Sequence, residues 1–367
     1  MKFSPSHVFF SIGSLIGVGV IMIYGRSLLI PLSFALLLSF MLYPINRWLR
    51  YRGWNDIFAS LGALFVFLLF ISGILTFFSN EVLALTDQWA TFRKRLLDLY
   101  SSIILFFNEN VPWMEELDEK ELVDDAIQWI SESWGEVLGR TFSESTSFLS
   151  DSFMVVLFSF LFLLFHKTMV DAARQAAPVG KQRAFIHMIK EIQQVGQKYL
   201  VGMVTLIAIL GLLNSIGLWI IGVDTPFLFG YLAAFLSVIP YIGTAMGAAI
   251  PIVYTLMAYD SIWMPFSVAI LFWGVQLLEG NFLNPKIVGK SVNINAFTAI
   301  LSLFLGAAIW GLSGMILFLP FAAMLKVVCR HYDALEPLAV LMDEDRSEDT
   351  SDTKSWWKMG LGKSENK

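Results

Sequence analysis

Residues 225–259 read TPFLFGYLAAFLSVIPYIGTAMGAAIPIVYTLMAY, an uncharged apolar run that decides the fold. A helix that crosses a membrane needs about 20 residues, so this run is too long for one straight span. Pro240, Gly243, Gly247 and Pro251 stand near its middle. Proline removes a backbone donor and glycine lowers helical preference, so we predict that the helix breaks there.

A second uncharged run, residues 291–325, has the same length and the same kind of interruption. Its glycines and proline are Gly306, Gly311, Gly314 and Pro320. Each run also carries a Leu-Ser pair ahead of its glycines, Leu236–Ser237 in the first and Leu301–Ser302 in the second. This internal similarity is weak, and chance explains it equally well.

Two arrangements of these runs are possible. If each is a helical hairpin, both ends of 225–259 lie outside the membrane and both ends of 291–325 lie inside. The loop 280–295, which holds Lys286 and Lys290 and no acidic residue, is then cytoplasmic, as its charge favours. Interrupted segments that enter from opposite faces form the midplane site of several secondary transporters. If each run is instead one long kinked helix packed through small residues, the loop lies outside.

The rest of the chain supports a membrane protein. Of 367 residues, 56% are hydrophobic and 15% are charged, whereas soluble domains carry about 25% charge. Five further runs lack charged residues and have the length of a span: 3–25, 27–46, 57–80, 199–223 and 261–278. A sixth, 152–166, is shorter and dense in apolar residues. We therefore predict an all-α polytopic integral membrane protein with about six full transmembrane helices plus two broken hairpins, or eight spans if each hairpin counts as one.

Charge predicts the orientation, because basic residues collect on the cytoplasmic side. The loop 47–56 holds three arginines against one aspartate, and residues 152–198 hold 6 basic and 2 acidic residues. Residues 80–151 hold 15 acidic and 5 basic residues and should lie outside. Both chain ends are then cytoplasmic, with Lys2 at one and Lys326 and Arg330 before the other.

These patterns divide the chain into six regions. They are three transmembrane helices in 1–79, an extracytoplasmic helical region in 80–150, a fourth transmembrane helix in 151–177, a cytoplasmic amphipathic helix in 178–198, a transmembrane core in 199–330 with the broken segments, and a cytoplasmic, mostly disordered tail in 331–367.

Ionisable and amide side chains at membrane depth are the candidate transport and coupling residues, because such groups are costly there. Glu279 is the strongest candidate, and its neighbours Gln276, Asn281, Asn284 and Lys286 could help to hold a cation or a hydroxylated molecule. Alternatively, Glu279 lies at the cytoplasmic interface and pairs with Lys286 or Lys290. Two lesser candidates are Asn214, which could instead join two helices by a hydrogen bond, and His166, which could be interfacial.

Several other functions lack support in the sequence. Gly289-Lys290-Ser291 resembles the end of a phosphate loop, but Asn284 stands where the leading glycine belongs. Zinc-protease and serine-hydrolase motifs are missing, a basic face for nucleic acid is missing, and Cys329 is the single cysteine. We therefore predict neither an enzyme nor a nucleic-acid binder, with no cofactor and no metal site. Transport must then be driven by a gradient.

Two stretches resemble the AI-2E family of bacterial inner-membrane transporters. Residues 195–251 are similar to its central part and residues 276–326 to its C-terminal signature, most specifically in EGNFLNPKIVG from Glu279 to Gly289. The departures are mild: Thr244 and Ala296 stand where proline is expected, and Ala307–Ala308 where paired glycines are.

The resemblance implies a homo-oligomeric permease of the bacterial inner membrane whose partners are the lipid bilayer and a small molecule or cation. Family members are linked to export of the signalling furanone autoinducer-2 or to exchange of sodium or lithium for protons. From another class, the alternative is a membrane scaffold or signalling protein that does not transport and whose extracytoplasmic helices bind a partner.

Overall fold

The structure is a computed structural model, and it describes residues 5–79, 81, 150–239, 242–289 and 293–343. Nearly all of the helical region expected at 80–150, the Lys290 side chain and the tail beyond Asp343 lie outside these ranges. Every regular element of the described residues is helical, which confirms the all-α prediction. Five of the described helices are long and apolar enough to cross a membrane, or six if one bent pair counts as a span.

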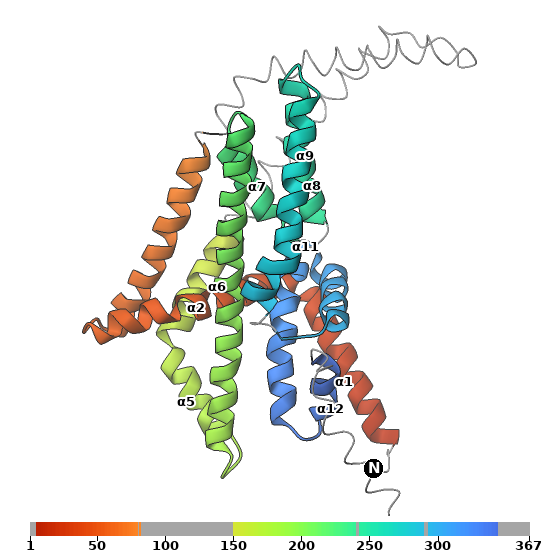
Figure 1. Cartoon of the computed structure of the whole chain (residues 1–367). Helices are drawn as coiled ribbons and strands as arrows, with labels where there is room; N and C mark the ends of the chain where they lie inside the picture. Colours follow the sequence, from red (N-terminus) through yellow and green to blue (C-terminus); the bar gives the residue numbers. More distant parts are fainter. Residues whose placement is uncertain (1–4, 80, 82–149, 240–241, 290–292, 344–367) are drawn as a thin grey trace, which may run out of the picture.

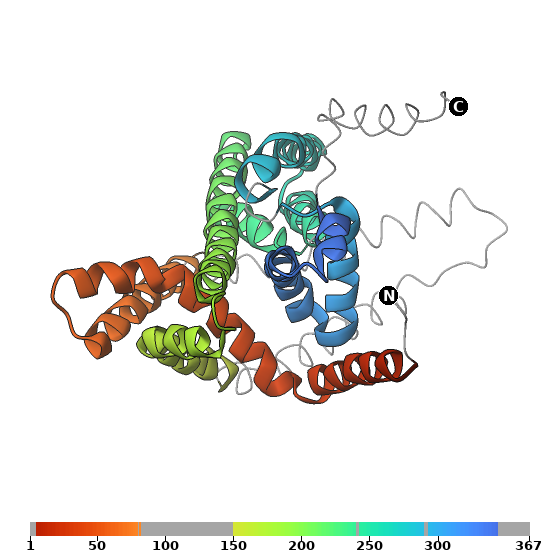
Figure 2. The same cartoon turned by 90° about the horizontal axis from the view of Figure 1, so that it is seen from below.

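The described helices within residues 5–176 form an arm beside the central bundle (Figure 2). It contains α1 (Pro5–Tyr24), α2 (Arg26–Tyr51) and the helix Asp56–Ser79. The helix Ser150–Leu164 then bends by 64° into α5 (His166–Ala176).

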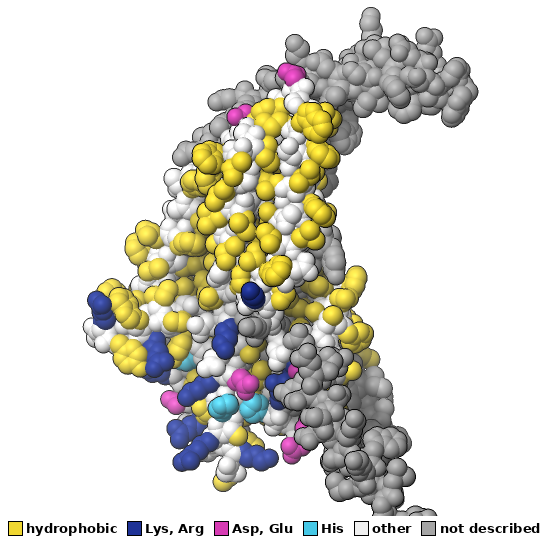
Figure 3. Space-filling view, viewed as in Figure 1, with side chains coloured by type: hydrophobic (Ala, Val, Ile, Leu, Met, Phe, Trp, Pro, Cys, Tyr) yellow, Lys and Arg dark blue, Asp and Glu magenta, His cyan; other side chains and the backbone are white. Residues whose placement is uncertain are grey.

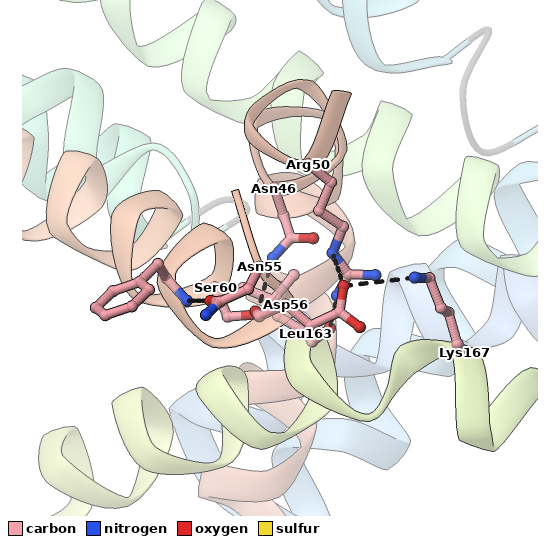
Figure 4. A network of polar contacts seen from close by, with 8 residues as sticks. Asn46, Arg50, Asn55, Asp56, Ser60, Leu163 and Lys167 are labelled. Carbon is pink, nitrogen blue, oxygen red and sulfur yellow. Dashed lines mark hydrogen bonds and ion pairs between the residues drawn. The ribbon is translucent and has the colours of Figure 1, made fainter. Parts of the chain in front are cut away.

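A polar network fixes this arm where its helices meet (Figure 4). Arg50 donates a hydrogen bond of 2.9 Å to the carbonyl oxygen of Leu163 and approaches Asp56 at 3.2 Å. Lys167 approaches the same Asp56 oxygen at 3.4 Å. Asp56 therefore joins its own helix to α2 and α5. It belongs to the loop 47–56, whose arginines predict the cytoplasmic side.

The central helix, α6 (Gln182–Ile221), is a single helix of 40 residues. The sequence suggested an amphipathic helix over 178–198 followed by a span from 199, but the two are continuous. At 1.5 Å per residue the helix is about 60 Å long, roughly twice the hydrocarbon thickness of a membrane. Figure 3 shows apolar side chains over its upper part and charged and histidine side chains over its lower end.

The first broken run is a hairpin of α7 (Pro226–Leu236) and α8 (Ile242–Ala258). The rings of Phe229 and Tyr254 lie 4.5 Å apart, which places its arms side by side. The two chain ends of the hairpin are joined through Tyr259, whose hydroxyl accepts a hydrogen bond from the backbone N–H of Asp224 and donates one to the carbonyl of Gly222. Both ends of the hairpin therefore lie at the C-terminal end of α6.

The second broken run is also a hairpin, which turns within α11 (Ala296–His331) at Gly311. Gly311 has φ 60°, a conformation that a side chain disfavours. Gly306 and Gly314 face each other across the arms without room for a Cβ atom. The base lies at the N-terminal half of α6, because His331 approaches Glu191 at 3.8 Å. The hairpins thus enter from opposite ends of α6 (Figure 1), which excludes the long kinked helices.

Three elements complete the core. α9 (Trp263–Leu278) is followed by two turns with π-helical hydrogen bonding, η1 (Glu279–Leu283) and η2 (Pro285–Gly289). The short helix α12 (Glu336–Met342) packs against α11. Seen from below, α7 and α8 lie among α6, α9 and α11 (Figure 2).

Candidate functional site

A small, partly open cavity lies where α6, the α7–α8 hairpin and α9 meet. Its polar lining residues come from all of these elements: Asn214, Ser237, Thr244, Gln276 and Glu279. The apolar and small lining residues are Leu210, Ala233, Ala234, Gly247, Phe272 and Val275. The volume of about 20 Å³ accommodates one water molecule or one ion of similar size.

Glu279 provides the ionisable group of this cavity. It begins the π-helical turn η1, directly after α9, and its side chain is 7% exposed. Such turns often interrupt α-helices at functional sites. Gln276, one turn earlier, lines the same cavity. Lys286 is exposed and forms no ion pair with Glu279, so among the described residues the interfacial lysine pairing is not found.

Asn214 provides an acceptor that the described residues leave unused. Its side chain is 4% exposed, and Oδ1 has no hydrogen-bond partner among the described residues. An unsatisfied buried polar group costs about 1–3 kcal/mol. A ligand in the cavity would recover this loss. The alternative role of Asn214, an interhelical hydrogen bond, leaves this oxygen unexplained.

The tip of the α7–α8 hairpin adds two hydroxyl groups. Ser237 donates its proton to the carbonyl of Ala234 at 2.7 Å, so its oxygen lone pairs remain available. Thr244 lines the cavity from the other arm. The close approach of the arms depends on Gly247, because a Cβ atom there would lie 2.9 Å from the Cα of Ala233. Carboxylate, amide and hydroxyl oxygens together suit hard cations.

The structure brings together three of the six residues proposed for transport and coupling, namely Glu279, Gln276 and Asn214. The other three, Asn281, Asn284 and Lys286, are exposed and do not line the cavity. Asn281 instead donates to the carbonyl of Leu277 at 2.9 Å. His166 lies outside the cavity and packs against the ring of Tyr43 at 4.3 Å.

The glycines and prolines expected at the helix breaks take different positions in the structure. Gly311 forms a turn, whereas Gly243, Gly247, Gly306 and Gly314 permit close contact between helix arms. The expectation that Pro251 and Pro320 contribute to the breaks is wrong, since both lie inside continuous helix. Membrane helices tolerate proline because neighbouring groups satisfy the freed backbone. Pro240 lies outside the described residues.

Sequence reasoning missed Ser237 and Thr244 as lining residues. Both carried a signal: Ser237 belongs to the repeated Leu-Ser pair, and Thr244 replaces an expected proline. Neither signal says that these hydroxyls face Glu279, because that depends on how the hairpin packs against α9.

Two helical hairpins that enter from opposite ends of α6, one of them beside a buried carboxylate, are typical of polytopic membrane proteins of the transporter class. The chain belongs to the AI-2E transporter family, whose sequence model matches residues 10–334. Similar proteins include YrrI of Bacillus subtilis, 25% identical over 84% of this chain and 87% of that protein. YueF of the same organism is 27% identical over 83% of this chain and 84% of that protein. AI-2 transport protein TqsA of Escherichia coli K12 is 22% identical over 88% of this chain and 91% of that protein.

Proposed function

We propose that this transporter exchanges a monovalent cation, Na+ or Li+, for protons, and that both compete for the cavity at Glu279. The observation that carries the proposal is that a buried carboxylate and the Asn214 oxygen, which has no hydrogen-bond partner among the described residues, line one cavity of single-ion size. The carboxylate holds either a proton or a cation, so binding of one releases the other. Such competition couples two gradients at one site without a nucleotide.

The hairpin arrangement supports alternating access to this cavity. Ser237 and Thr244 flank the tip of the α7–α8 hairpin, while Glu279 and Asn214 belong to the surrounding helices. Displacement of this tip would open the cavity toward the C-terminal end of α6, where the hairpin enters. The α11 hairpin enters from the other end of α6, the oppositely directed arrangement found in several secondary transporters, although none of its described residues lines the cavity.

The expected setting of this activity is the bacterial inner membrane, with both termini in the cytoplasm and several copies associated. The orientation rests on the positive-inside rule, applied to Arg50, Lys167 and the basic residues of α5 and the lower half of α6. On the face that Figure 3 shows, basic side chains gather over the lower part of the molecule, as the rule requires. The exposed apolar side chains of α6 and α9, such as Trp219 and Trp273, suit contact with lipid or a second copy.

A second candidate is export of a small polar molecule like autoinducer-2. It is supported by the name of the Escherichia coli relative TqsA, which describes AI-2 transport. A hydroxylated furanone does not fit into about 20 Å³, so the hairpin tip would have to move away before it binds. In this case Asn214, Gln276 and the hydroxyl groups would bind the sugar-like oxygens.

Flux in proteoliposomes tests these candidates together. Vesicles with an imposed pH gradient should take up Na+ or Li+ with the wild-type chain, and Glu279→Gln should abolish this uptake. Asp171→Asn, an exposed change on α5, is the matched control and should transport normally. Autoinducer-2 flux without cation flux would favour the second candidate. If neither moves, the scaffold alternative replaces both.

A further inference from the structure

Three potential metal-binding side chains meet at the base of the α11 hairpin. His187 and Glu191 lie one turn apart on α6, and His331 ends α11. Glu191 Oε2 lies 3.9 Å from His187 Nδ1 and 3.8 Å from His331 Nε2. The donor atoms of all three residues lie within 4.8 Å of one another.

The backbone orients His331 for metal binding. Its Nδ1 lies 3.0 Å from the carbonyl oxygen of Val327, so the proton belongs on Nδ1 and the lone pair on Nε2. Nε2 is the atom that approaches Glu191. A backbone carbonyl that holds the second ring nitrogen is the usual partner of a metal-ligating histidine.

The donor set and its spacing indicate the metal. Two imidazoles with one carboxylate, plus an open fourth position, are typical of Zn²⁺ sites. In a tetrahedral Zn²⁺ site the ligand atoms are about 3.3 Å apart, so the two contacts to Glu191 need to shorten by roughly half an ångström. His187 is 75% exposed and can make this adjustment, whereas His331 is 24% exposed and held by Val327.

We propose that His187, Glu191 and His331 bind Zn²⁺ or a similar divalent transition metal, with water in the fourth position. The site is separate from the transport cavity, because Glu191 precedes Asn214 by 23 residues, about 35 Å along α6. The ion would tie the end of the α11 hairpin to α6. Sequence motifs did not predict it, because His331 reaches the pair on α6 only through the tertiary fold.

Metal titration of the purified full chain, made without a histidine tag, tests this site. Co²⁺ should give the visible absorption of a tetrahedral complex, and one equivalent of Zn²⁺ should displace it. His187→Asn, Glu191→Gln and His331→Asn should each weaken binding at least about tenfold, the loss typical even for partners outside the ligand set. His166→Asn, at the start of α5, is the matched control and should bind like the wild type.

Hydrogen exchange provides a second readout that does not depend on transport. Zn²⁺ should slow amide exchange over residues 324–331 of the wild type and not of His187→Asn. Because His187 is exposed, that variant keeps its fold. Metal binding as strong as that of the wild type in the three variants, or no Co²⁺ and Zn²⁺ binding by the wild type, would overturn the proposal.

Discussion

At the scale of single residues, the cavity at Glu279 contains two groups whose burial costs free energy. Glu279 is a carboxylate that is almost fully enclosed, and the oxygen of Asn214 has no partner among the described residues. Burial of an unpaired charge or polar group costs free energy, so selection for stability would replace both. Their positions on one cavity therefore point to a ligand that occupies it during transport.

The Asn214→Leu variant separates this ligand role from a structural one. Removal of a buried amide whose oxygen has no partner among the described residues should leave the melting temperature unchanged or raise it, while cation uptake is lost. Ser215→Ala is the matched control, because the Ser215 hydroxyl is also buried without a described partner but does not line the cavity. That variant should be equally stable and transport normally. Normal uptake by a folded Asn214→Leu protein would remove Asn214 from the site.

At the scale of elements, the α7–α8 hairpin depends on close contact between its arms. Gly247→Ala would place a methyl group 2.9 Å from the Cα of Ala233, and neither backbone can yield without separating the arms. We expect the free energy of unfolding to fall by about 1–3 kcal/mol, which lowers the melting temperature, and we expect reduced cation uptake. The control is Gly274→Ala on α9, where a Cβ atom meets nothing within 4 Å. Equal melting temperatures for the two variants would contradict this account of the hairpin.

The docking of α12 against α11 should depend on pH through Asp343. Hydrogen bonds from Lys326 and Arg330, at 2.7 and 2.8 Å, lower the pKa of Asp343 from its ordinary value of 3.8. A carboxyl group whose pKa falls on folding stabilises the fold above its unfolded pKa, and this contribution disappears as the pH falls through the folded value.

Amide exchange over Glu336–Met342 should therefore be slow at neutral pH and, corrected for intrinsic rates, should lose protection as the pH drops below about 4. Asp343→Asn should lose the same protection at neutral pH. Asp333→Asn, an exposed neighbour, serves as the control and should keep it. If Asp343→Asn exchanges like the wild type, these ion pairs do not hold α12.

At the scale of the whole molecule, the orientation in the membrane can be measured directly. On a Cys329→Ser background, a membrane-impermeant maleimide added to intact cells should label Ser261→Cys and not Lys286→Cys. These two exposed positions lie at opposite ends of the segment Trp263–Gly289. Permeabilised cells should allow both to react. Labelling of Lys286→Cys in intact cells would reverse the proposed topology.

Much of this architecture follows from local sequence, and the rest does not. Charge-free runs mark the spans, Gly311 marks one turn and Gly243 stands at the start of α8, because backbone preferences act locally. The continuity of α6 through Lys198 was missed, since the change from amphipathic to apolar sequence needs no break in the helix. That Asn214 faces Glu279 while Asn284 does not is a matter of tertiary packing, which spacing along the chain does not determine.

The central claim is that the cavity at Glu279 binds the transported cation in competition with protons, and equilibrium binding of radioactive sodium tests it most directly. The purified wild-type protein should bind Na+ saturably, and this binding should weaken as the pH falls, because protons occupy the same carboxylate. Glu279→Gln should show no saturable binding at any pH, while Asp171→Asn should bind as the wild type does. Sodium binding by folded Glu279→Gln with the wild-type affinity and pH dependence would contradict the account.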